Sequence, residues 1–207
     1  MDYKNLFLRS FISLIFISIY FISLLINFYL VFYLVILVYF LVLIEILIYF
    51  KEYKFIPLMY IITSFIFFIF VDFNNENFFI FNFFIILVIL FDIFSYIIGN
   101  YLGKNKLIKI SPNKTIEGFL GGVFFSIFFS LLFAFFVSIK INSQLLFFII
   151  LIISSAFIGD LIESFFKRKN HLKNSSFFVP GHGGVFDRFD SFLFSIIFYS
   201  IFNSILL

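Results

Sequence analysis

Residues 10–44 contain no charged side chain, and this run constrains the fold more than any other feature of the sequence. A membrane-spanning helix needs roughly 20 apolar residues, at about 1.5 Å of rise per residue. The apolar stretch as a whole, interrupted only by Asn27 and Glu45, is about twice that length. We therefore expect two spans, near residues 7–26 and 29–50, with a turn at Asn27.

The composition of the 207-residue chain extends this conclusion to the whole sequence. Hydrophobic residues make up 64% and charged residues 12%, whereas a soluble domain has about 25% charged residues. This is too little charge for a water-facing surface, which excludes a soluble globular protein, a disordered tail and a collagen. The chain has no cysteine, which excludes a disulfide scaffold, a Cys metal site and a thiol nucleophile.

Further apolar runs complete the expected fold, an all-α, polytopic transmembrane helical bundle of about seven spans. The first run is not followed by a small-residue cleavage site, so we expect it to be retained as a span. The other five spans are expected near residues 55–71, 78–99, 117–139, 144–166 and 189–207.

Basic residues predict the orientation, because they are retained on the cytoplasmic side of short loops. With the N-terminus cytoplasmic, 13 of the 14 Lys and Arg residues lie inside and only Lys140 lies outside. We expect a single domain, 1–207, in the cell (inner) membrane, with N-terminal spans to about residue 91 and a catalytic region from 92 to 191 before the last span. Its active site would face the cytoplasm in two polar segments, near 99–117 and 167–190.

Four polar residues near the end of the sixth expected span share one helical face. They are Asp160, Glu163, Ser164 and Lys167, at positions i, i+3, i+4 and i+7. A carboxylate inside a span costs about 2.5–3.5 kcal/mol, so two on one face need protein, water or a cation beside them. One interpretation is a structural ion pair of Lys167 with Asp160 or Glu163. The other is a metal ligand beside a phosphate-binding Lys167 and Arg168.

A glycine-rich segment follows, which reads Pro180-Gly181-His182-Gly183-Gly184-Val185-Phe186-Asp187-Arg188-Phe189-Asp190-Ser191. Its glycines allow the backbone to approach a ligand closely and to direct N–H groups at an anion. Asp187 and Asp190 stand at i and i+3, and carboxylate oxygens suit Mg²⁺, which takes one or two of them with substrate phosphates and water. With Asp160 they predict a Mg²⁺–polyphosphate site at the membrane surface. His182 is either a base or phosphate donor, or a residue that stabilises the turn by a hydrogen bond.

Residues 111–118 form a second polar segment, typical of a helix start with Ser111 as N-cap and Pro112 at the first helical position. Helix N-termini attract phosphate, and Lys114 adds a positive charge there. An ordinary capped helix with a cytoplasmic lysine explains the same residues.

Two acidic residues lie within other spans. Asp92 begins a small or polar stripe at helical spacing that continues through Ser95, Tyr96, Gly99 and Gly103. It either lines the site or makes a polar contact between helices. Glu45 matches no motif, and we expect it to face another helix or water.

At these residues the sequence resembles the CDP-diacylglycerol synthase (phosphatidate cytidylyltransferase) family. The signature of that family runs Ser-x-x-Lys-Arg-x-x-x-x-Lys-Asp and then a stretch that ends Pro-x-His-Gly-Gly-x-x-Asp-Arg-x-Asp. The resemblance covers two blocks, about 92–122 and 159–191. In this chain the signature reads Ser164, Lys167, Arg168, Lys173, Asn174, Pro180, His182, Gly183, Gly184, Asp187, Arg188 and Asp190.

The chain departs from the family pattern in two residues and in length. Asn174 stands where the family has Asp, and Phe94 stands where Gly is usual after the first Asp. The chain is also a shortened member, so we expect N-terminal spans of the family to be missing. These departures would affect efficiency more than chemistry, because Asp160, Asp187 and Asp190 remain.

The resemblance implies a nucleotidyltransferase of phospholipid biosynthesis, in which the phosphate of phosphatidic acid attacks the α-phosphorus of CTP to give CDP-diacylglycerol and pyrophosphate. It implies Mg²⁺ held by Asp160 and Asp187, K⁺ as a second cation, the lipid bilayer as surroundings, a homodimer and no nucleic-acid partner. The residues implied to be catalytic are Asp160, Asp187, Lys167, Arg188, Asp190 and His182. Those implied to bind substrate are Ser111, Lys114, Ser164, Arg168, Lys173, Gly183 and Gly184.

Other functions are compatible with parts of this pattern. A CTP-dependent polyprenol or phytol-type lipid kinase would also use a cytoplasmic nucleotide site, although the glycine-rich run favours the cytidylyltransferase. A transporter or channel would explain buried carboxylates, but it predicts charges spread along several spans rather than gathered at one level. A non-enzymatic structural protein would explain the shortening and Asn174.

Overall fold

In a computed structural model of the protein, the residues described are 15, 18–71, 73, 75–108, 110–179 and 183–206. The chain divides into two compact units, and each is described by itself. The first unit comprises Met1–Phe65 and Phe166–Phe189, and the second comprises Ile66–Phe165 and Asp190–Leu207. The unit boundaries fall within three helices, α3, α6 and α7.

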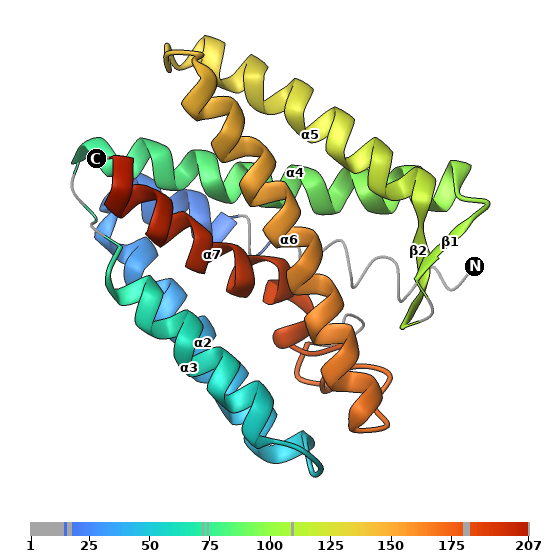
Figure 1. The fold of residues 1–207 in the computed structure, drawn as a ribbon. Helices are drawn as coiled ribbons and strands as arrows, with labels where there is room; N and C mark the ends of the chain where they lie inside the picture. The colour runs from blue at the N-terminus through green and yellow to red at the C-terminus, as the bar shows by residue number, and fades with distance from the viewer. Residues whose placement is uncertain are drawn as a thin grey trace. The chain divides into compact units, whose positions relative to one another are not determined.

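Helices make up most of the described chain, together with one two-stranded hairpin (Figure 1). The all-α prediction is therefore confirmed, and the hairpin is a small addition to it. The elements are a helical segment at residues 18–26, α2 (Tyr29–Tyr49), α3 (Phe55–Ile69), α4 (Asn75–Leu102), β1 (Lys106–Ile108), β2 (Ser111–Thr115), α5 (Ile116–Phe136), α6 (Ser143–Lys169) and α7 (Phe186–Leu206).

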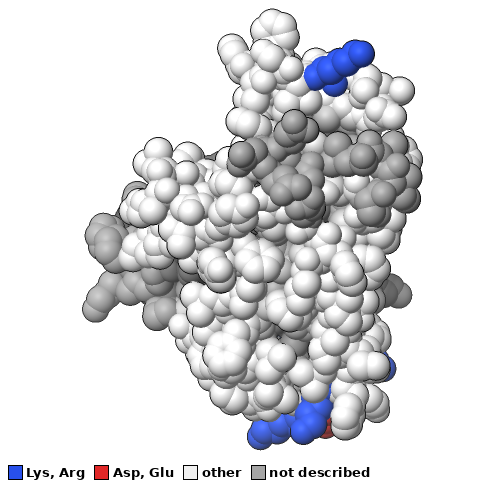
Figure 2. Space-filling view, turned by 90° about the vertical axis from the view of Figure 1, so that its left-hand side faces the viewer, with Lys and Arg blue, Asp and Glu red and all other residues white. Residues whose placement is uncertain are grey.

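Four of the described helices are long and apolar enough to cross a membrane, and they make the chain a multi-pass membrane protein. They are α2, α5, α6 and the part of α4 from Phe78 to Leu102, while α3 is apolar but shorter. Figure 2 shows a face whose described surface is largely uncharged. Such a face suits contact with lipid. The count of seven spans and the cytoplasmic N-terminus stay predictions.

In the first unit, the expected turn at Asn27 is confirmed. The helical segment at 18–26 ends there, and α2 begins at Tyr29. The Asn27 side chain accepts a hydrogen bond from the Tyr29 N–H at 3.0 Å, which satisfies a backbone donor at the start of α2. Helices α2 and α3 lie side by side (Figure 1), with the hydroxyl groups of Tyr39 and Ser64 2.6 Å apart.

In the second unit, α4 and α5 approach closely along small residues. A Cβ added to Gly118 would lie 2.7 Å from the Ser95 carbonyl oxygen and 2.9 Å from the Gly99 Cα, so the two backbones leave no room for a side chain. Small residues allow such close approach between helices in membranes. The stripe through Ser95 and Gly99 is therefore a helix-packing surface. Phe94, the departure from the family pattern, stacks on Phe125 and Phe129 of α5.

The predicted helix start at Ser111 is wrong. Ser111–Thr115 is strand β2, which pairs antiparallel with β1 so that Lys106 lies opposite Thr115. Helix α5 begins at Ile116, and the Thr115 hydroxyl caps it by accepting from the Gly118 N–H at 3.1 Å. The backbone of this segment is satisfied by the neighbouring strand, which the local cap pattern could not indicate.

Candidate active site

A glycine brings α6 and α7 together beside the signature acids of the second unit. A Cβ on Gly159 would lie 2.6 Å from the Asp190 carbonyl oxygen and 3.2 Å from the Ser191 Cα, so only glycine allows this approach. The next residue on α6 is Asp160. The packing of Gly159 therefore places Asp160 against the first turns of α7.

Ser191 joins two carboxylates from different helices. Its side-chain oxygen lies 2.9 Å from Asp160 Oδ1 and 3.0 Å from Asp92 Oδ1, and Ser191 itself is 1% exposed. A serine hydroxyl carries one proton, so it can donate to only one of the two acceptors at a time. Asp92 thus makes a polar contact between α4 and α7, and its role in lining the site stays a prediction.

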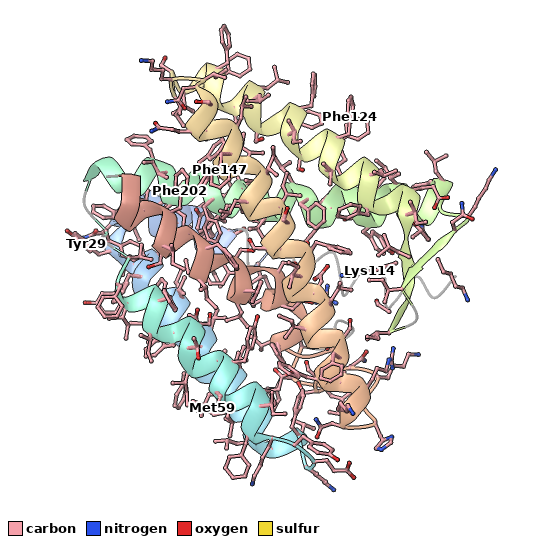
Figure 3. All side chains as sticks on the ribbon, in the orientation of Figure 1. Tyr29, Met59, Lys114, Phe124, Phe147 and Phe202 are labelled. Carbon is pink, nitrogen blue, oxygen red and sulfur yellow. The ribbon has the colours of Figure 1, made fainter. Side chains whose placement is uncertain are left out.

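Lys114 of β2 supplies a positive charge to the same cluster. Its Nζ forms an ion pair with Asp160 Oδ2 and lies 5.4 Å from the centre of the Phe157 ring, an arrangement that fits a cation–π contact (Figure 3). The β1–β2 hairpin therefore carries Lys114 to α6. We call Asp92, Lys114, Asp160, Asp190 and Ser191 the carboxylate cluster.

The acidic residues of the second unit interact with one another. The Asp190 carboxylate interacts electrostatically with Asp160, Glu163 and Asp92, and Glu163 is 1% exposed. Like charges this close repel unless a cation or a proton lies between them. No group of three or more acidic or imidazole side chains among the described residues is arranged to hold a metal ion alone. Mg²⁺ binding by these carboxylates stays a prediction, and it would need only one or two of them together with water and substrate phosphate.

Asp187 lies in the first unit, where both of its carboxylate oxygens accept hydrogen bonds. Oδ1 accepts from Lys167 Nζ at 2.7 Å, and Oδ2 accepts from the backbone N–H groups of Ser175 and Gly184, each at 2.9 Å. Lys167 thus pairs with Asp187 across the loop between α6 and α7, and Asp160 pairs with Lys114. Neither is one of the two lysine pairs considered from the sequence, which were Lys167 with Asp160 or with Glu163.

The predicted metal ligands Asp160 and Asp187 belong to different units. The structure brings Asp160 together with Asp92, Lys114 and Ser191, and it brings Asp187 together with Lys167. The assignment of both aspartates to one metal ion stays a prediction.

The backbone amides of the two glycines after His182 donate hydrogen bonds within the protein. Gly184 N–H donates to Asp187 Oδ2, and Gly183 N–H donates to the Val179 carbonyl oxygen at 3.1 Å. Gly183 has φ = +94°, a conformation that L side chains rarely adopt. Their predicted role in substrate binding stays a prediction. His182 lies outside the described residues.

The remaining predicted residues differ in their exposure. Arg168, Lys173 and Arg188 are exposed, and Arg168 Nη1 lies 3.4 Å from the Leu172 carbonyl oxygen. Ser111 and Ser164 are partly exposed. The basic side chains of the first unit therefore reach solvent, where they can meet a phosphate group.

Sequence reasoning gave no role to two residues that the structure connects to these sites. Ser191 is the last residue of the glycine-rich run and carries no signal of its own, yet it bridges Asp160 and Asp92. Glu45 matched no motif, yet it accepts hydrogen bonds from the N–H groups of Val185 and Phe186. The sequence does carry one signal for Glu45, which is that a carboxylate within a long apolar run must be satisfied by a partner.

Comparison with known proteins shows the family of the chain. The family model described as the cytidylyltransferase family matches residues 6–206. The chain belongs to the cytidylyltransferase family. The carboxylate cluster and the Asp187–Lys167 pair both lie within the matched residues.

Curated relatives with the name phosphatidate cytidylyltransferase come from Staphylococcus haemolyticus (strain JCSC1435), Staphylococcus epidermidis (strain ATCC 12228 / FDA PCI 1200) and Staphylococcus aureus (strain COL). Each is 48% identical to this chain over 110 residues. The aligned segment covers 52% of this chain and 42% of each relative. Similarity at this level thus extends over less than half the length of these relatives.

Proposed function

We propose that the protein transfers CMP from CTP to phosphatidic acid, giving CDP-diacylglycerol and pyrophosphate. The observation that carries this proposal is the carboxylate cluster, in which Lys114 pairs with Asp160 and Ser191 joins Asp160 to Asp92. Carboxylates and a lysine in contact can hold a divalent cation and a phosphate group at one place. Family membership and the names of the relatives supply the substrates, CTP and phosphatidate.

The proposed reaction is a displacement at phosphorus. A phosphate oxygen of phosphatidic acid forms a bond to the α-phosphorus of CTP, the bond from the α-phosphorus to the bridging oxygen breaks, and pyrophosphate leaves with that electron pair. The attacking phosphate is already ionised near neutral pH, so no strong general base is required. The enzyme's contribution is then positioning and charge compensation, as in other phosphoryl transfers.

Residues of both units have parts in this proposal. Exposed Arg168, Lys173 and Arg188 would hold the phosphate groups of lipid and nucleotide, and Lys114 would contact the nucleotide from the hairpin. Lys167 would join them when released from Asp187. Arginine suits this role because its planar guanidinium binds two phosphate oxygens at once.

Mg²⁺, with Asp160 and Asp187 as its proposed ligands, would supply neutralisation of the triphosphate charge and polarise the α-phosphate. K⁺ is the proposed second cation near the same carboxylates. We also propose that the site faces the cytoplasm of the cell membrane, where a lipid and a water-soluble nucleotide can meet, and that the protein is a homodimer.

The experiment is product analysis with the purified full chain, CTP labelled at the α-phosphate, phosphatidate in mixed micelles, and Mg²⁺. The proposal predicts label in CDP-diacylglycerol and release of pyrophosphate. A parallel reaction with CTP labelled at the γ-phosphate and a polyprenol tests the lipid-kinase alternative. Label in a prenyl phosphate, with none in CDP-diacylglycerol, would refute the proposal.

A further inference from the structure

Glu45 is a carboxylate buried in the apolar helix α2, with 0% of its surface exposed. Its Oε2 accepts hydrogen bonds from the backbone N–H groups of Val185 at 2.8 Å and Phe186 at 3.2 Å. Phe186 is the first residue of α7 and Val185 directly precedes it, at a helix start where N–H groups have no partner within the helix. A negative charge at a helix N-terminus is also favoured by the helix dipole. Glu45 therefore caps α7 from a helix 140 residues away in sequence.

The comparison with α5 shows why this arrangement is unusual. Helix α5 is capped by its own Thr115, one residue before the helix. At the same position before α7 stands Val185, whose side chain has no hydrogen-bond acceptor. The acceptor comes instead from α2, so the position of the α7 N-terminus depends on α2 within the first unit.

Gly184 and Ser175 lie next to the contact between Glu45 and the start of α7. A Cβ on Gly184 would overlap both Glu45 Oε1 and Ser175 Oγ, so Gly184 leaves the space that these two side chains occupy. The Gly184 and Ser175 N–H groups donate to Asp187 Oδ2. Two carboxylates, Glu45 and Asp187, thus hold four backbone amides of one loop.

We propose that Glu45 is a positioning residue, whose carboxylate fixes the α7 N-terminus and thereby sets Asp187 and Arg188 for phosphate and metal binding. This proposal rests on the proposed function for its catalytic consequence. Asp187 and Arg188 are the residues that immediately follow the two amides Glu45 binds, in the first turn of α7. A shift of that turn moves both side chains, and misplacement by about 1 Å can reduce a rate by about 100-fold.

The test compares Glu45→Leu, Glu45→Ala and Glu45→Gln in the purified full chain, with Glu52→Gln as the matched control. Glu52 is exposed in the loop after α2, so its substitution removes a carboxylate of the same unit without touching α7. One readout is hydrogen exchange of the Ser175 and Gly184–Phe186 amides. The other is kcat and KM for CTP with phosphatidate and Mg²⁺.

We expect the Leu and Ala variants to exchange these amides faster and to lose roughly 10- to 100-fold in kcat at similar folded yield. Glu45→Gln keeps an acceptor oxygen, so it should retain much of the slow amide exchange and much of the kcat. The Glu52→Gln control should match the wild type in both. Full kcat in a folded Leu or Ala variant would overturn the catalytic part of the proposal. A purely structural Glu45 would change the folded yield and leave kcat per folded molecule unchanged.

The exchange readout separates this proposal from the proposed function. If the wild type makes no CDP-diacylglycerol, slow exchange at Val185 and Phe186 that Glu45→Ala abolishes still supports the cap. If neither Leu nor Ala folds, the wild-type exchange decides the question, because a helix start without a partner exchanges quickly. Fast exchange of Val185 and Phe186 in the folded wild type would overturn the cap itself.

Discussion

Ser191→Ala removes a hydroxyl that joins Asp160 to Asp92. The Ser191 oxygen lies 2.9 and 3.0 Å from the two carboxylates and is buried, so its loss leaves two acids facing each other without their shared donor. A hydrogen bond to a charged group contributes about 1.5–3 kcal/mol, and one proton serves one acceptor at a time. We therefore expect Ser191→Ala to lower the free energy of unfolding by about 1.5–3 kcal/mol.

The matched control is Ser195→Ala, one turn further along α7. Ser195 is also buried, but its hydroxyl donates at 2.6 Å to the backbone oxygen of Ser191. A neutral bond of this kind contributes about 0.5–1.5 kcal/mol.

The assay is chemical unfolding in detergent together with CDP-diacylglycerol formation per folded molecule. If Ser191 orients Asp160, turnover should fall by about 10- to 100-fold in Ser191→Ala alone. Equal stability and equal turnover in the two variants would refute the bridging role.

Three further outcomes are expected. Gly184→Ala should cost about 1–3 kcal/mol of stability from overpacking against Glu45, measured by unfolding, and an unchanged midpoint would contradict the packing. Asn174→Asp should maintain or raise turnover, since it restores the acid of the family signature at an exposed position, and a large loss of turnover would contradict this. Cysteines introduced at Asn105 and Phe177, both exposed, should react with impermeant reagents only from the cytoplasmic face, and labelling from outside would overturn the topology.

The helical plan could be predicted because span length and apolar runs are local properties of the sequence. The turn at Asn27 is an example, since one polar residue divides a stretch too long for a single helix. Ser111 shows the limit of local reasoning. Its cap-like pattern was interpreted as a helix start, but Ser111 pairs with Ile108 of β1, three residues upstream, which no residue within 111–118 indicates.

The residue types of the site could be predicted from the sequence, but its ion pairs could be predicted only in part. Helical spacing identified the face that carries Asp160 and Lys167, because neighbours on one helix follow from the period. It could not show that Asp160 pairs with Lys114 of the hairpin or that Lys167 pairs with Asp187. Glu45 illustrates the same limit, since its partners are more than a hundred residues away.

The most direct test of the account is CDP-diacylglycerol formation from CTP and phosphatidate by the purified wild type and by Asp160→Asn. The account predicts Mg²⁺-dependent product from the wild type and a loss of several orders of magnitude in the variant, because the amide keeps the size of the side chain but not the charge that holds the cation. Folding should survive, since a neutral amide is easier to insert into a membrane than a carboxylate. Near-normal turnover in folded Asp160→Asn would contradict the central claim.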